Sequence, residues 1–146
     1  MYSTIVVPVD GSEAASTALD IACKLASADG ARLHILHIPE SLAHDTLLVW
    51  GVGAVPMEAS AEQLERAGRQ LLDAATQAAS ERGITDVEGS LHQGDPARVI
   101  IEQAKTLDAD AIVMGSRGLS DIAGLVVGSV SHKVSHTAPC HVISVH

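Results

Sequence analysis

Aromatic residues are nearly absent from the chain, which has no phenylalanine, one tyrosine and one tryptophan. Single-stranded nucleic acids stack their bases on aromatic rings, so this composition argues against such a partner. Basic residues are also scarce, because 9 Lys and Arg stand against 18 Asp and Glu and give a formal net charge of -9. Affinity for nucleic acid and for anionic membrane surfaces depends on positive charge, so we expect neither as a partner.

Long apolar runs are missing as well. The longest, Leu47 to Met57, contains Gly51, Gly53 and Pro56 and is too short to cross a bilayer. The first residues lack the basic segment and apolar core of a secretory signal. We therefore expect a cytoplasmic protein without direct membrane insertion.

The chain has only two cysteines, Cys23 and Cys140, and they lack the spacing of a CxxC motif. We expect both to be reduced and buried as small apolar side chains. The acidic excess keeps a protein soluble, as in salt-adapted organisms, and it is equally consistent with an ordinary acidic cytosolic protein.

Strand-like and helical segments alternate along the chain. Runs of β-branched and apolar residues predict five strands, at residues 4–9, 32–38, 86–92, 110–114 and 140–145. Helical spacing of apolar residues predicts four helices, over 12–28, 61–82, from Pro96 onward and over 128–136. Ser12 and Asp95 are the expected N-caps, and Gly30 is an expected stop. The alternation predicts one α/β domain over 1–146, with an open parallel sheet covered by helices on both faces.

Residues 41–60 do not fit this alternation. A segment of this length is functional, mobile or partly structured more often than it is idle. It contains Trp50 and several large apolar residues. We expect these side chains either to fold back on the core or to meet another subunit.

The most informative pattern is Gly115-Ser116-Arg117-Gly118, followed after nine residues by Gly128-Ser129. It lies between a predicted buried strand and a predicted helix. Backbone N–H groups of such a loop converge on phosphate oxygens, and the helix N-terminus adds partial positive charge. The pattern predicts nucleotide binding, although the glycines could also be plain turn residues. Arg117 could pair with a phosphate or point to solvent.

Three features together resemble the universal stress protein family in its ATP-binding branch. They are the run Val6 to Ser12 (VVPVDGS), the pair His37-Ile38, and the glycine pattern followed by the last strand from Pro139 to Val145. The resemblance covers the whole chain in order. It implies a Rossmann-like sheet of five parallel strands in the order 3-2-1-4-5, and dimerisation through the last strand, here residues 140–146.

The resemblance also implies a set of ATP-binding residues. Pro8 and Ile38 would flank the adenine, and Asp10 would hold the ribose hydroxyls or a nucleotide-bound Mg²⁺ or Mn²⁺. The phosphates would be held by the glycine pattern, at Gly115, Gly118, Gly128 and Ser129, with Arg117 beside them. Independently, ligands of open α/β sheets bind where the strand order reverses, which places the Asp10 and Gly115 loops across one crevice.

Other candidate residues have plainer explanations. Asp10 could serve only as a turn former before Gly11-Ser12. His132 and His136 are four residues apart and could share a metal, but an exposed polar face explains them equally well. Asp108 and Asp110 lie at the start of a strand, at the wrong end of the sheet for the crevice. The remaining strand histidines are expected at edges or in caps rather than in a cluster: His34, His37, His92 and His141. Gly51-x-Gly53 resembles part of a dinucleotide fingerprint, but no strand precedes it.

The sequence lacks the signatures of common nucleotide hydrolases and of several other enzymes: GxxxxGK[ST], GxSxG, CxxC and HExxH. We therefore expect a regulatory protein whose ATP or AMP state tunes oligomerisation and partner binding, and not an enzyme. One alternative is a slow ATPase or phosphotransferase using Asp10, Ser120 or Asp121. Another is a dimerisation module without nucleotide.

Self-association and a larger partner complete the expectations. The edge of the last strand favours a homodimer, and the apolar segment 47–57 could extend it to a tetramer. The resemblance, together with the acidic composition, suggests a membrane transporter regulated under osmotic stress as the partner.

Overall fold

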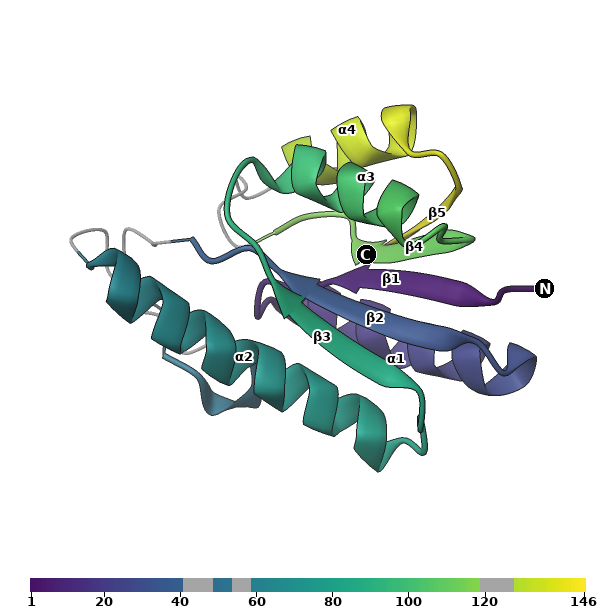
Figure 1. The fold of residues 1–146 in the computed structure, drawn as a ribbon, viewed down its shortest axis with the longest axis horizontal. Helices are drawn as coiled ribbons and strands as arrows, with labels where there is room; N and C mark the ends of the chain where they lie inside the picture. The colour runs from purple at the N-terminus through teal and green to yellow at the C-terminus, as the bar shows by residue number, and fades with distance from the viewer. Residues whose placement is uncertain (41–48, 54–58, 119–127) are drawn as a thin grey trace.

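The computed structural model describes residues 1–40, 49–53, 59–118 and 128–146. Strands and helices alternate along these residues, as Figure 1 shows. The elements are β1 (Thr4–Pro8), α1 (Glu13–Asp29), β2 (Arg32–His37), the short 3-10 turn η1 (Val49–Gly51), α2 (Ala61–Glu81), β3 (Val87–Leu91), α3 (Pro96–Thr106), β4 (Ala111–Gly115), α4 (Ser129–Thr137) and β5 (His141–Val145).

The five strands form one parallel sheet in the order β3-β2-β1-β4-β5. This confirms the predicted architecture and strand order. The order reverses between β1 and its two neighbours, because β2 follows β1 on one side and β4 returns to its other side. Such a reversal separates the loops after β1 and β4, and ligands of open α/β sheets bind there.

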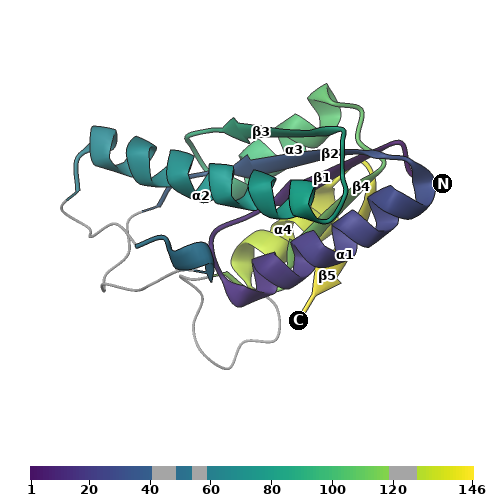
Figure 2. The ribbon, with the colours of Figure 1, turned by 90° about the horizontal axis from the view of Figure 1, so that it is seen from below.

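Helices cover both faces of the sheet, and Figures 1 and 2 show α1 and α3 on opposite sides of it. Successive strand residues point to opposite faces, so each strand supplies both cores. In β1, Ile5 and Val7 pack with α1 and α2, whereas Val6 packs with α3 and α4. Burial on both faces explains why the central strands are continuous apolar runs rather than alternating ones.

The predicted helix ends are confirmed. The Ser12 hydroxyl accepts a hydrogen bond from Ala15 N–H, and the Asp95 carboxylate accepts one from Arg98 N–H. Gly30 ends α1 at a φ of 67°, a left-handed conformation that favours glycine.

Trp50 folds back on the protein. It is half-buried and packs against the core between the sheet and α1 and α2. Val49 N–H also donates to Gly11 O, which ties this segment to the loop after β1. Of the two alternatives expected for this segment, folding back on the core is therefore the one observed for Trp50. Residues 41–48 and 54–58 lie outside the described part, and the tetramer contact stays a prediction.

The two cysteines are free, and their environments differ. Cys23 is buried in the core, as expected, but Cys140 is only half-buried. The expectation of full burial was wrong for Cys140 because it immediately precedes β5, the edge strand. Within the described ranges, no helix combines the length and the apolar character needed to cross a membrane.

Asp110 joins the amino ends of the strands, away from the crevice, as expected. Its carboxylate accepts hydrogen bonds from Ser3 N–H (2.7 Å) and Thr4 N–H (2.8 Å). These bonds, led by that from Thr4, lower the pKa of Asp110 below the ordinary value of an aspartate. The carboxylate therefore contributes to stability in its charged form.

Asp110→Asn is expected to lower the melting temperature at neutral pH, because the amide is a weaker acceptor for the two N–H groups. The contribution of the charge is present above the unfolded pKa near 3.8 and is lost as the pH falls through the lower folded pKa. Thermal melts of wild type and variant should therefore converge in acid. The matched control is Asp108→Asn, because Asp108 is exposed at a φ of 52° that asparagine tolerates. Equal melting temperatures for D110N and wild type at neutral pH would contradict the role of the charge.

Candidate functional site

A cleft opens at the carboxyl ends of β1, β2 and β4, where the strand order reverses. Its walls come from the loops after these strands, from the first half of α2, and from the amino ends of α3 and α4. The lining residues from the strand ends and the loops after them are Pro8, Val9, Asp10, Ser12, His37, Ile38, Pro39, Glu40, Val52, Gly53, Met114, Gly115, Ser116, Arg117 and Gly118. The lining residues from helices are Ala15, Leu64, Ala67, Gly68, Leu71, Pro96, Ile100, Val130 and Ser131.

Six of the eight predicted ATP-binding residues line this cleft: Pro8, Asp10, Ile38, Gly115, Arg117 and Gly118. The structure thus brings together residues from three separate loops. Among the described lining residues, Gly128 and Ser129 are absent, but the next two residues of α4, Val130 and Ser131, are present. The ligand roles of all eight stay predictions.

Asp10 lies in a tight turn between β1 and α1. Its Oδ1 accepts a hydrogen bond from Ser12 N–H at 2.9 Å, and Gly11 between them has a φ of 86°. The role as a turn former is therefore real. It does not compete with a role in the cleft, because the turn itself holds the carboxylate at the cleft wall.

Gly115 is required by packing against α1. A Cβ at this position would lie 2.8 Å from Ala14 Cβ and 3.2 Å from the Ala14 carbonyl carbon. The sequence pattern suggested that glycine is needed here for the approach of phosphate, and the structure adds a second reason that involves no ligand. Close packing of α1 against the end of β4 fixes where the loop begins.

Ser116 anchors the same loop to two other elements. Its N–H donates to Val145 O at 2.7 Å, and its carbonyl accepts from Gly128 N–H at 2.5 Å. Its Oγ lies 3.0 Å from Nδ1 of His146. The loop after β4 is therefore held to the end of β5 and to the start of α4. Residues 119–127, including the alternative catalytic candidates Ser120 and Asp121, lie outside the described part.

Among the described residues, no side chain caps the amino end of α4. Its N-cap is Gly128, in an extended conformation (φ -76°, ψ 167°), whereas α1, α2 and α3 are capped by the side chains of Ser12, Ser60 and Asp95. The first N–H groups of a helix have no intrahelical partner. A glycine N-cap leaves them available to an anion in the cleft.

Helix α2 forms a wall that the sequence did not predict. A Cβ at Gly68 would lie 2.8 Å from Pro39 Cγ and 3.2 Å from His37 Cδ2, so glycine lets α2 pack closely on the end of β2. Leu64 and Leu71 flank it on the same helix face. The apolar spacing along α2 was visible in the sequence, but its proximity to β2 was not.

His37 connects β1 and β2 at the floor of the cleft. It is buried, and its Nδ1 donates to Val9 O at 2.7 Å, since a carbonyl oxygen only accepts. Burial lowers the pKa of His37, while the bond to Val9 and the charge of Asp10 act in the opposite direction. The sequence marked His37 as part of a family motif and as an edge or capping residue, but β2 lies between β3 and β1 and His37 is buried there. The contact with Val9 O places the proton of the neutral ring on Nδ1.

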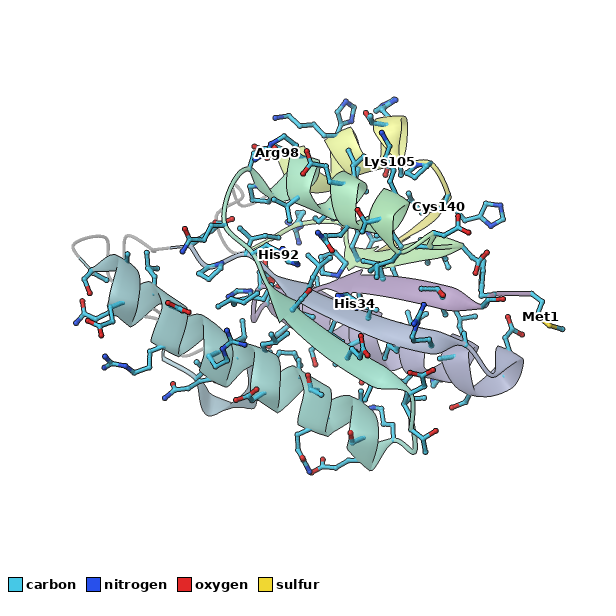
Figure 3. The ribbon with its side chains drawn as sticks, viewed as in Figure 1. Met1, His34, His92, Arg98, Lys105 and Cys140 are labelled. Atoms are coloured by element: carbon cyan, nitrogen blue, oxygen red, sulfur yellow. The ribbon has the colours of Figure 1, made fainter. Side chains whose placement is uncertain are left out.

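His34 and His92 form a cluster through Ser90, contrary to the expectation of separate edge residues. Nε2 of His34 lies 2.8 Å from Ser90 Oγ, and that oxygen lies 2.7 Å from Nε2 of His92. Figure 3 shows His34 on β2 and His92 beyond the end of β3. The expectation failed because the parallel register places Ser90 opposite Leu36, on the face that His34 also occupies.

Acid is expected to destabilise the protein through His34 and His37. Burial lowers the pKa of both, so below the ordinary imidazole value of about 6.5 the unfolded chain binds protons that the folded chain excludes. Stability is therefore full above that value and is lost as the pH falls toward the folded pKa values. Between about pH 7.5 and about pH 5.5, the free energy of unfolding measured in urea should fall less for His34→Gln than for wild type. The control is His132→Gln, at an exposed position, and an unchanged loss in H34Q would refute this role.

Comparisons with known proteins agree with the fold. The sequence profile of the universal stress protein family matches residues 1–146. The universal stress protein YxiE of Bacillus subtilis (strain 168) is 34% identical over 148 residues, which cover 99% of each chain. A crystal structure of a universal stress protein in complex with cAMP is 31% identical, with a TM-score of 0.73 over 99% of this chain and 97% of that chain. The Archaeoglobus fulgidus protein in complex with dAMP is 25% identical, with a TM-score of 0.68 over 99% and 98%. The chain belongs to the universal stress protein family.

Proposed function

We propose that the chain binds ATP, as its Mg²⁺ or Mn²⁺ complex, in the cleft at the carboxyl ends of β1, β2 and β4. One observation carries the proposal: a single cleft combines apolar walls with the uncapped amino end of a helix. A nucleotide needs both, because its base is flat and apolar while its phosphates are anionic. The cAMP and dAMP complexes of the two similar proteins support an adenine nucleotide as the ligand.

The base would lie at the α2 side of the cleft. Ile38 and Pro8 lie at the ends of β2 and β1, and Leu64 and Leu71 of α2 add apolar surface. Ile38 is buried, so its side chain would fix the floor while its backbone groups would meet the base edge. This arrangement supports the predicted roles of Pro8 and Ile38.

The phosphates would lie toward the loop after β4 and the start of α4. Arg117 is exposed at this loop and supplies a cation, and Gly118 also lines the cleft. Asp10 and Glu40 add negative charge to the lining, which favours a metal–nucleotide complex over the free triphosphate. The metal would neutralise phosphate charge and meet the Asp10 carboxylate.

Isothermal titration with ATP–Mg²⁺, AMP and cAMP tests the proposal. We expect one ATP per chain, and Arg117→Ala is expected to weaken ATP affinity about tenfold, or ~1.4 kcal/mol, through loss of charge-assisted hydrogen bonds. The matched control is Arg98→Ala, since Arg98 is an exposed arginine of α3 paired with Glu102 and does not line the cleft. Absence of binding at about millimolar ATP would overturn the proposal.

The proposed role is regulatory: nucleotide state would set self-association and, through it, contact with a partner such as a membrane transporter. A ligand shifts such an equilibrium only by binding two states with different affinity. Strand β5 is an edge of the sheet and is the expected dimer contact, over residues 140–146. Light scattering after size exclusion should report a change of mass between ATP-loaded and nucleotide-free protein.

A slow ATPase or phosphotransferase is the competing function. Of its three candidate residues, Asp10 is the one that lies in the described part of the chain and lines the cleft. Multiple-turnover phosphate release separates the two functions. The regulatory proposal expects negligible release. Sustained release that Asp10→Ala abolishes, with ATP binding retained, would favour the enzyme.

A further inference from the structure

Two imidazoles lie side by side on an exposed face of α4. His132 and His136 are one helical turn apart, and their ring centroids are 4.4 Å apart at an interplanar angle of 65°. Both residues are exposed, while Ser131 and Val134 on the opposite face of the helix are buried. The sequence could not show that the rings meet, and the structure shows that they do.

Neither imidazole is committed to another group in the part of the chain that the structure describes. No side-chain hydrogen bond or ion pair joins the imidazole of His132 or His136 to a described residue, and the contact between the two rings is their one side-chain interaction with described residues. By contrast, Nε2 of His34 and Nε2 of His92 are both engaged with Ser90. The nitrogen lone pairs of the α4 pair are therefore available to a ligand from solvent.

The separation of the rings suits chelation. A divalent transition metal bound to imidazole nitrogen at about 2.0–2.1 Å requires two donor nitrogens roughly 3–3.4 Å apart. The ring centroids are 4.4 Å apart, so the two imidazoles are already close to the spacing that chelation requires. His136 also lies in the last turn, where the helix dipole favours positive charge.

We propose that His132 and His136 supply two ligands to a site for a borderline divalent transition-metal ion of the Ni²⁺, Cu²⁺ and Zn²⁺ class. Imidazole suits these ions, whereas Mg²⁺ and Ca²⁺ prefer oxygen. Among the described residues, no group of three or more His, Cys, Asp and Glu is arranged to hold a metal, so water completes the coordination. The site is separate from the ATP cleft and does not depend on nucleotide binding.

Calorimetric titration of tag-free, nucleotide-free protein with Ni²⁺ tests the proposal. Ni²⁺ is the probe because a softer ion would also bind the half-buried thiol of Cys140. We expect one Ni²⁺ per chain, and His132→Gln and His136→Gln should each weaken its affinity by at least about tenfold, or ~1.4 kcal/mol. His141→Gln, at an exposed histidine that begins β5, should keep the affinity of wild type.

Thermal melting gives a second readout. Saturating Ni²⁺ should raise the melting temperature of wild type and H141Q but not of H136Q, because a ligand stabilises the state that binds it. Without metal, circular dichroism should be the same for all variants, since the changed side chains are exposed. Retained Ni²⁺ affinity in both H132Q and H136Q, or an equal loss in H141Q, would overturn the proposal.

Discussion

Gly128→Asp, a change at the buried N-cap of α4, is expected to weaken ATP binding strongly. Asp95 caps α3 by accepting a hydrogen bond from Arg98 N–H at 3.0 Å, and an aspartate at the N-cap of α4 would do the same for the first turn of that helix. The cap adds about a few tenths of a kcal/mol to stability. Its charge would lie where the phosphates are proposed, and like charges in contact cost several kcal/mol, so ATP affinity should fall at least about a hundredfold.

Gly128→Ser separates charge from size. A serine caps the helix without a negative charge, so ATP affinity should fall by less than about tenfold. Titration with ATP–Mg²⁺ measures the ATP affinity of each variant, and a thermal melt measures its stability. If G128D is as stable as wild type and also binds ATP as tightly, the start of α4 does not hold phosphate.

Gly115→Ala is expected to destabilise the protein by about 1–3 kcal/mol, the usual cost of overpacking. The added Cβ would lie 2.8 Å from Ala14 Cβ and 3.2 Å from Arg117 O, and backbone atoms cannot yield as a flexible side chain can. Urea unfolding measures the change directly. The same displacement would move the loop that carries Arg117, so ATP affinity should fall in parallel.

Two variants sharpen this measurement. Gly53→Ala is the matched control, because Gly53 also lines the cleft but a Cβ there would meet no atom of the described residues within 4 Å. Ala14→Gly should relieve part of the cost of G115A, so the double variant should lose less stability than the sum of the single changes. Strict additivity would show that Ala14 is not the cause.

The sequence predicted the fold where chemistry is local. The caps at Ser12 and Asp95, the left-handed stop at Gly30 and the buried strands each depend on a few neighbouring residues, so they could be read directly. The strand order brings three loops that are far apart in the chain to one cleft. That order could be predicted because the family resemblance implied it.

The remainder depended on how elements pack, which a single sequence does not record. Gly68 is a helix residue in the sequence, and only its close approach to Pro39 and His37 in the structure shows why it is glycine. The link from His34 to His92 required the register of β2 against β3. His132 and His136 had the right spacing, but spacing alone could not tell whether their rings touch.

The hydrogen bond from Ser116 N–H to Val145 O connects the loop beside the cleft directly to the end of the edge strand β5. If a second molecule pairs along that strand, dimer formation and ATP binding would share a coupling free energy. Thermodynamic linkage makes this coupling reciprocal. Dimer formation would then alter ATP affinity by the same factor by which ATP alters dimer formation. Affinity measured across a range of protein concentrations would consequently report on assembly without any direct measurement of mass.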